Sequence, residues 1–67
     1  MGMTAEILDL TKAQIISLRE AKRQGFVAAH MQRRRSVERL AAKGLLVKSG
    51  LVTYRLTAEG REALRNL

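Results

Sequence analysis

A helix that ends at a glycine and leads directly into a short hairpin is the feature that most restricts the fold of this chain. Val37 and Leu40 recur at helical spacing. Gly44 follows them at the position after a helix where a residue with positive φ is favoured. The pattern therefore predicts one helix over residues 31–43.

Two short β-prone runs, LLVK and VTYRL, follow this helix. The dipeptide Ser49-Gly50 between them is a turn signal, so residues 45–56 are expected to form a two-stranded β-hairpin. Side chains alternate between the two faces of a strand. One face is expected to carry Val52, Tyr54 and Leu56, and the other Leu51, Thr53 and Arg55.

The two sides of the predicted helix differ in chemistry. At about 100° per residue, one side carries Val37, Leu40, Ala41 and Gly44. The opposite side carries Gln32, Arg35, Arg39, Ala42 and Lys43. Arginine and glutamine can reach base edges in a DNA major groove, and a small alanine lets the helix approach closely. We therefore expect the first side to pack on the core and the second to read DNA.

The sequence also resembles a known family over this region. The run RSVERLAAKGLLV, a short spacer and then YRLTAEGREAL are similar to the recognition helix, wing and following helix of winged helix-turn-helix DNA-binding domains. MarR-like regulators and small phage and bacterial relatives are similar in this way. The resemblance spans Val37 to Arg61 and continues more weakly from Leu10. It implies an α+β fold, a small winged helix-turn-helix with a three-helix core and a two-stranded β-hairpin wing, and double-stranded DNA as the partner.

An earlier helix has its own start signal. Thr11 and Gln14 have capping-box spacing, and Leu10 and Ile15 are placed as a hydrophobic staple. The helix is expected from about Lys12 to Arg23, ending near Gly25. Its expected core stripe is Ile15, Leu18 and Ala21.

The segment after Gly25 departs from the family pattern. A helix-turn-helix needs about two further helical turns before the recognition helix, and there is hardly room for them. Phe26 to Ala29 either forms a truncated second helix or is extended chain that fills the core with Phe26 and Val27. At the other end of the chain, Thr57 is expected to cap a last helix. The expected inward residues of that helix are Ala63, Leu64 and Leu67.

Length and composition limit the class of protein. Residues 1–67 suffice for one domain, with residues 1–10 as an N-terminal arm or short helix. The chain has no cysteine and one histidine, and no acidic pair forms a recognisable motif. We therefore expect no enzymatic activity, no metal or other cofactor, and no small-molecule ligand. No apolar run approaches the roughly 20 residues that span a bilayer, and no signal-peptide core is present, so a cytoplasmic location is expected.

Positive charge is the strongest compositional signal. The chain has 13 Lys and Arg against 6 Asp and Glu, for a net charge of +7. Between Arg19 and Lys48 the only acids are Glu20 and Glu38. Basic charge gathered around one helix is typical of nucleic-acid binding. The alternative is a charge-rich surface that only keeps a small protein soluble.

The candidate DNA-binding residues divide into two roles. Arg35 and Arg39 point away from the core and are expected to contact bases. Arg33 and Arg34 lie at the rims of the apolar side and, like Lys48 and Arg55, suit phosphate contacts. Cations at a helix N-terminus oppose the helix dipole, so either this cost is accepted or the helix starts later. The complete candidate set is Gln32, Arg33, Arg34, Arg35, Ser36, Arg39, Lys43, Lys48 and Arg55.

Apolar residues without an obvious place in the core predict a homodimer. They are Ile7, Leu8 and Ile16, and Leu67 lies at the very end of the given sequence. Exposed apolar groups of this kind mark association surfaces, and a two-fold dimer would present two recognition helices to a symmetric site. The alternative is a monomer in which Ile7 and Leu8 cover their own core.

The sequence thus predicts a small transcriptional regulator that binds double-stranded DNA. A second interpretation keeps the fold but makes it a protein–protein adaptor without DNA binding, because a fold does not fix a function. A third, an RNA- or single-strand-binding module, is disfavoured because the chain has only one Phe and one Tyr for base stacking.

Overall fold

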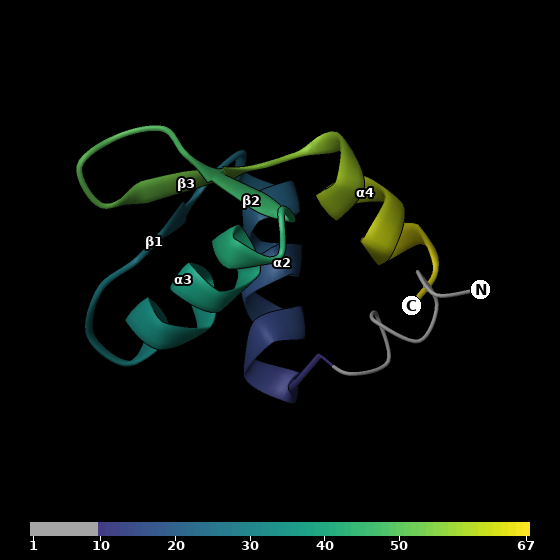
Figure 1. The fold of residues 1–67 in the computed structure, drawn as a ribbon, viewed down its shortest axis with the longest axis horizontal. Helices are drawn as coiled ribbons and strands as arrows, with labels where there is room; N and C mark the ends of the chain where they lie inside the picture. The colour runs from purple at the N-terminus through teal and green to yellow at the C-terminus, as the bar shows by residue number, and fades with distance from the viewer. Residues whose placement is uncertain (1–9) are drawn as a thin grey trace.

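A computed structural model describes residues 10–67 of the chain. Over these residues it is a small α+β structure with three α-helices and one three-stranded antiparallel sheet (Figure 1). The elements in chain order are α2 (Lys12–Gln24), β1 (Val27–Ala28), the 3-10 turn η1 (Met31–Arg33), α3 (Arg34–Ala42), β2 (Leu46–Lys48), β3 (Thr53–Leu56) and α4 (Ala58–Arg65). The expected arm over residues 1–10 lies outside the described residues, except for Leu10, which is buried.

The sheet has one strand more than the sequence predicts. β3 lies between β1 and β2 and is antiparallel to both, with Val27 opposite Tyr54 and Leu46 opposite Leu56. The predicted two-stranded hairpin is present as β2 and β3, and the sheet gains a third strand because the residues after α2 are extended and pair with β3. Of the two alternatives for this segment, extended chain is confirmed and a truncated helix is excluded.

Only one of the two apolar residues expected to fill the core from this segment does so. Val27 is fully buried, whereas Phe26 remains 43% exposed. Neighbouring side chains of an extended chain point to opposite sides, so the two cannot both face the core.

Helix α2 begins and ends on local signals. The Thr11 hydroxyl accepts a hydrogen bond from the Gln14 backbone N–H, and the Gln14 side chain accepts one from the Thr11 N–H, each at 3.1 Å. The helix ends at Gly25, whose φ is 89°. Leu18 and Ala21 are buried as expected and Ile15 is half-buried. The buried Ser17 was not expected, and its hydroxyl is satisfied by the Ala13 carbonyl at 3.0 Å.

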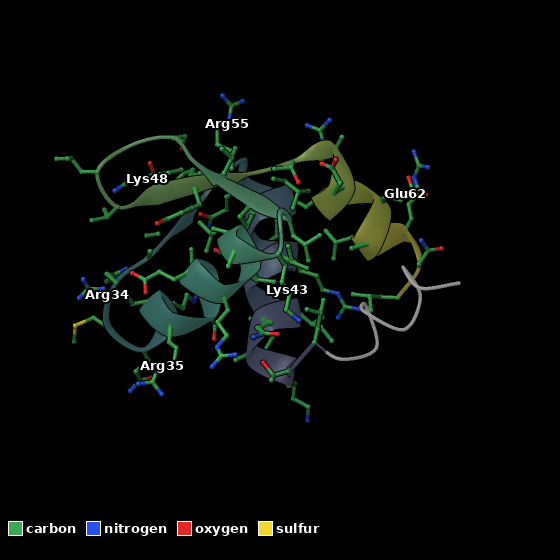
Figure 2. The ribbon with its side chains drawn as sticks, in the orientation of Figure 1. Arg34, Arg35, Lys43, Lys48, Arg55 and Glu62 are labelled. Carbon is green, nitrogen blue, oxygen red and sulfur yellow. The ribbon has the colours of Figure 1, made fainter. Side chains whose placement is uncertain are left out.

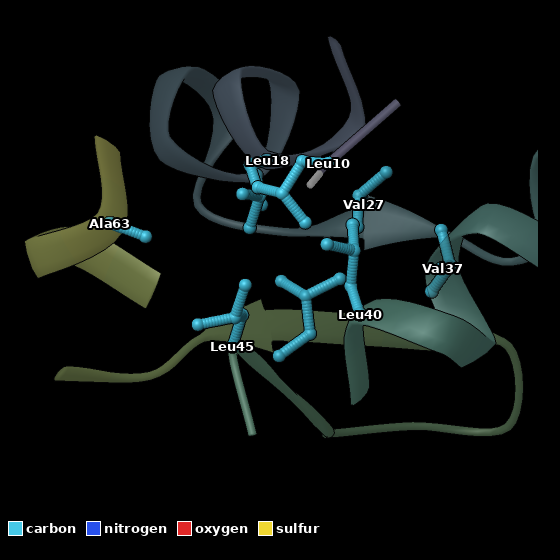
Figure 3. Packing of buried hydrophobic residues seen from close by; sticks show 9 residues of the cluster. Leu10, Leu18, Val27, Val37, Leu40, Leu45 and Ala63 are labelled. Carbon is cyan, nitrogen blue, oxygen red and sulfur yellow. The ribbon is translucent and has the colours of Figure 1, made fainter. Parts of the chain in front are cut away.

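The core lies where α2, α3, α4 and the sheet meet (Figure 3). In Figure 1, α3 lies in front of α2, the sheet runs along the upper side of both, and α4 closes the end away from the hairpin loop. The buried hydrophobic cluster comprises Leu10, Leu18, Ala21, Val27, Val37, Leu40, Leu45, Leu46 and Ala63. None of the helices in residues 10–67 is both long and apolar enough to cross a bilayer.

The start of helix α4 is hydrogen-bonded to the residue that follows α3. The Thr57 hydroxyl accepts from the Gly60 N–H at 3.0 Å, as the predicted cap requires, and donates to the Gly44 carbonyl at 2.7 Å. Ala63 is fully buried and Leu64 packs against the core. The inward position expected for Leu67 is wrong: it is 41% exposed, because the helix ends at Arg65 and no longer sets its direction.

Candidate nucleic-acid interface

The α-helix of the predicted recognition segment starts later than residue 31, as one of the two alternatives for its basic first turn allows. A helix over 31–43 was expected, but Met31–Arg33 form a 3-10 turn and the α-helix begins at Arg34. Met31 has a φ of 53°, a conformation that breaks the helical path, and His30 before it makes no side-chain cap. The end is as predicted, with Gly44 at a φ of 81°.

The outer side of α3 carries cations without acidic partners. Val37 and Leu40 are fully buried on the inner side. On the other side Arg35, Arg39 and Lys43 are exposed and line a shallow depression, with Glu38 and Ala42. Within residues 10–67 no ion pair engages these three cations, since Glu38 pairs with Arg34 instead. We name these five residues the α3 surface.

A second part of the site lies between the start of α3 and the hairpin. Arg34 and Lys48 line one groove, together with Tyr54 and the loop residues Leu51 and Val52. Lys48 faces Tyr54 across the strand pair, so its side chain lies on the core side of the sheet, toward α3 (Figure 2).

The charge of Arg34 is only weakly engaged. Its Nε lies 3.4 Å from Glu38 Oε2, and the two side chains are 72% and 56% exposed. An exposed pair of this kind contributes little, so Arg34 stays available to another anion.

Arg55 is separated from this groove by the sheet itself. It faces Val47 across the strand pair, on the opposite side from Lys48 and Tyr54. Figure 2 shows Arg55 projecting from the upper edge of the molecule, while Arg34 and Arg35 project from the lower left. The predicted site residues are therefore not brought together on one surface.

The remaining candidates lie at the start of α3. Gln32 is exposed in η1, whereas Arg33 and Ser36 are half-buried. Gln32 was expected on the outer side of a continuous helix. Because η1 interrupts that helix, its position does not follow from helical spacing.

The hairpin loop is longer than the predicted Ser49-Gly50 turn. Both residues donate backbone hydrogen bonds to the Thr53 carbonyl, at 2.9 and 3.3 Å, and Lys48 pairs with Tyr54. Leu51 and Val52 consequently belong to the loop rather than to the strand, and the predicted strand position of Val52 is wrong. In this longer loop the Thr53 carbonyl accepts the backbone hydrogen bonds of Ser49 and Gly50. A two-residue turn would not predict these bonds.

Sequence reasoning missed the apolar residues near the groove. Met31 is 84% exposed and Leu51 is 92% exposed, and both line the groove with Arg34 and Lys48. For Leu51 the sequence signal was indirect, namely its position directly after the Ser49-Gly50 turn dipeptide, and for Met31 there was none.

The surface as a whole has an excess of positive charge. All 13 basic residues lie within residues 10–67. Three of them (Arg23, Arg34 and Arg65) form ion pairs, which leaves ten without one in this part of the chain. Such an excess produces a positive potential that attracts polyanions.

Comparison with known proteins gives no further assignment. No protein-family model, curated protein or solved structure matches this chain.

Proposed function

We propose that this chain is a winged-helix protein that binds double-stranded DNA and acts as a small transcriptional regulator. In this proposal α3 enters the major groove, and the β2–β3 hairpin lies along the neighbouring backbone. The order α2, β1, α3, β2, β3 and the strand order β1-β3-β2 support it, because they place one exposed helix beside one hairpin.

The exposed cations of the α3 surface carry the proposal. Arg35 and Arg39 lie on the side of α3 opposite the buried Val37 and Leu40. One side of α3 therefore packs on the core, and the other is open to solvent. Arginine makes bidentate contacts to guanine in the major groove. Ala42, exposed in the same depression as Arg35 and Arg39, adds little bulk where the helix approaches the bases.

Arg34 and Lys48 are assigned to the phosphate backbone. They line the groove that separates the proposed reading helix from the hairpin, where a DNA strand would pass. Arg55 is not part of this contact, since it lies on the other face of the sheet.

Duplex binding measured across a salt series tests the proposal. We expect the logarithm of the binding constant to fall steeply and linearly with the logarithm of the salt concentration. Arg39→Ala is expected to weaken binding to a preferred duplex by roughly 1–3 kcal/mol and to relax base preference. Lys48→Ala should weaken binding to all duplexes alike and reduce the slope by about one.

Arg65→Ala is the matched control for these variants. Arg65 is an exposed arginine on α4 that pairs with Glu62 at 3.6 Å. Its removal should leave base preference unchanged. Full affinity and preference in both Arg35→Ala and Arg39→Ala would refute the α3 assignment.

A homodimer is part of the proposal. Ile7 and Leu8 lie outside the described residues, but Ile16 and Leu67 are exposed, at 51% and 41%. Sedimentation equilibrium should give a dimer for the wild type and a monomer for Ile16→Glu. A monomeric wild type at micromolar concentration, with and without DNA, would end this part of the proposal.

One observation favours the second candidate function, a protein–protein adaptor. The exposed Met31 and Leu51 place apolar surface in the α3–hairpin groove, as a protein partner would require. Absence of duplex binding even at low salt would favour this adaptor.

A further inference from the structure

A second set of cations lies outside the α3 surface and its groove. Five basic residues line two adjoining hollows and come from three different elements. They are Arg19, Lys22 and Arg23 on α2, Arg55 on β3 and Arg61 on α4. We name them the α2–α4 surface.

The first hollow is suited to a phosphate group. It has a volume of about 280 Å³ and three cations border it, Lys22, Arg55 and Arg61. The rest of its lining is uncharged: Ala21, Gly25, Val47 and Leu56. No acidic and no aromatic residue lines it. Cations without a stacking platform suit a phosphate rather than a base.

The second hollow continues the same surface along α2. Lys22 borders both hollows, and Arg19, Arg23 and Leu64 complete the second. Glu20 pairs with Arg23 at 2.7 Å and offsets part of its charge. Arg19, Lys22, Arg55 and Arg61 form no ion pair with any acid in residues 10–67.

This surface is separate from the α3 surface. The two have no residue in common, and Arg55 lies on the sheet face away from Lys48. The longest dimension of residues 10–67 is 34 Å. Bending one duplex around a body of this size to meet both surfaces costs elastic free energy, for a bend of about 40–90° over roughly 20–30 base pairs, so two separate duplexes are favoured.

From this arrangement we propose that the α2–α4 surface is a second site for a DNA phosphate backbone, so that one chain bridges two duplexes. The inference rests on the proposed function of α3 and adds a second partner molecule. Because phosphate contacts carry no base information, the second duplex is held without regard to sequence. Capture of that duplex depends steeply on salt.

A two-duplex capture experiment tests bridging. One duplex with a preferred site is fixed to beads, and capture of a second, labelled duplex of unrelated sequence is measured with the full chain. The double variant Arg55→Ala, Arg61→Ala should keep its preference for the fixed duplex but capture the labelled duplex about tenfold less or worse, because two phosphate contacts are lost. Both side chains are exposed, so we expect the variant to remain folded, which a melting curve checks.

Two further variants separate the possible causes. Arg65→Ala removes one exposed arginine from α4 outside both hollows and should capture the second duplex as the wild type does. Arg35→Ala with Arg39→Ala should lose base preference but retain weak, salt-sensitive duplex binding. That residual binding should weaken further, with a shallower salt dependence, when Arg55→Ala and Arg61→Ala are added, because Arg34 and Lys48 still contact phosphates.

The outcomes distinguish this inference from the function on which it rests. A wild type that binds one duplex but captures no second one overturns bridging and leaves DNA binding intact. Capture that survives Arg55→Ala, Arg61→Ala also overturns it, because the second duplex is then held by a second protomer's α3 surface. A wild type that binds no duplex at any salt concentration overturns both.

Discussion

Helices α2 and α3 are both followed by a glycine with positive φ, but they begin differently. Each ends before a glycine in the left-handed region, Gly25 at a φ of 89° and Gly44 at 81°. The start of α2 is closed by the reciprocal hydrogen bonds of Thr11 and Gln14. The start of α3 has no side-chain cap and follows Met31, a non-glycine residue with positive φ.

The difference shows what holds each helix in place. α2 satisfies its first backbone donors within one turn, so its start is stable locally. α3 depends on its buried side, where Val37 and Leu40 are fully inaccessible, and on the chain that leaves β1. Its first turn is thus free of capping side chains and carries Arg34 and Arg35 against the helix dipole.

The largest expected effect tests whether α3 is held by its buried side. Leu40→Ala should lower the free energy of unfolding by roughly 2–5 kcal/mol, through lost burial and the cavity left behind. Leu18→Ala on α2 should cost a similar amount, since Leu18 is also fully buried. Denaturant unfolding measures both. A small loss for Leu40→Ala beside a large one for Leu18→Ala would show that α3 is not anchored as its burial indicates.

The glycines that follow the two helices give the next largest effect on stability. Gly25→Ala and Gly44→Ala should each cost about 1–2 kcal/mol, because alanine is disfavoured at positive φ. A Cβ at either position would meet no atom within 4 Å, so the cost is conformational alone. Thermal melts of the two variants should therefore shift alike. A clearly unequal shift would mean that the ends are not equivalent.

The capping box of α2 should have a smaller effect. Thr11→Ala removes the acceptor for the Gln14 N–H and should lower the free energy of unfolding by about 1 kcal/mol. Thr11→Ser keeps the hydroxyl oxygen and should restore most of the loss. Equal stability of the alanine and serine variants would show that the cap does not hold this end.

The start of α3 should give the smallest effect and the opposite sign. Met31→Asn should raise the free energy of unfolding by roughly 0.5 kcal/mol, because asparagine tolerates the left-handed region better than methionine. The Met31 side chain is largely exposed, so little burial is lost. Met31→Val should be destabilising, as a β-branched residue is disfavoured there. If asparagine and valine behave alike, Met31 does not hold a positive φ in solution.

The elements whose signals are local could be predicted from the sequence. Thr11 with Gln14 and Thr57 with Gly60 mark helix starts, and Gly44 marks a helix end. In each case the hydrogen-bonded residues are close together in the chain, so the interaction can be recognised from a short run of sequence. The inner side of α3, with Val37 and Leu40, followed from helical spacing in the same way.

The third strand and the grouping of cations depend on contacts between distant segments, and so does the choice of Arg34 as the first residue of α3. β1 exists because residues 27 and 28 pair with β3, about 25 positions later, and two residues have no strand signal of their own. The alternation of side chains along a strand predicts which face of the sheet Arg55 occupies. It does not predict that Lys22 of α2 and Arg61 of α4 lie near Arg55. Contacts between distant segments depend on how helices and strands pack, and that packing is a property of the whole core rather than of any local run of residues.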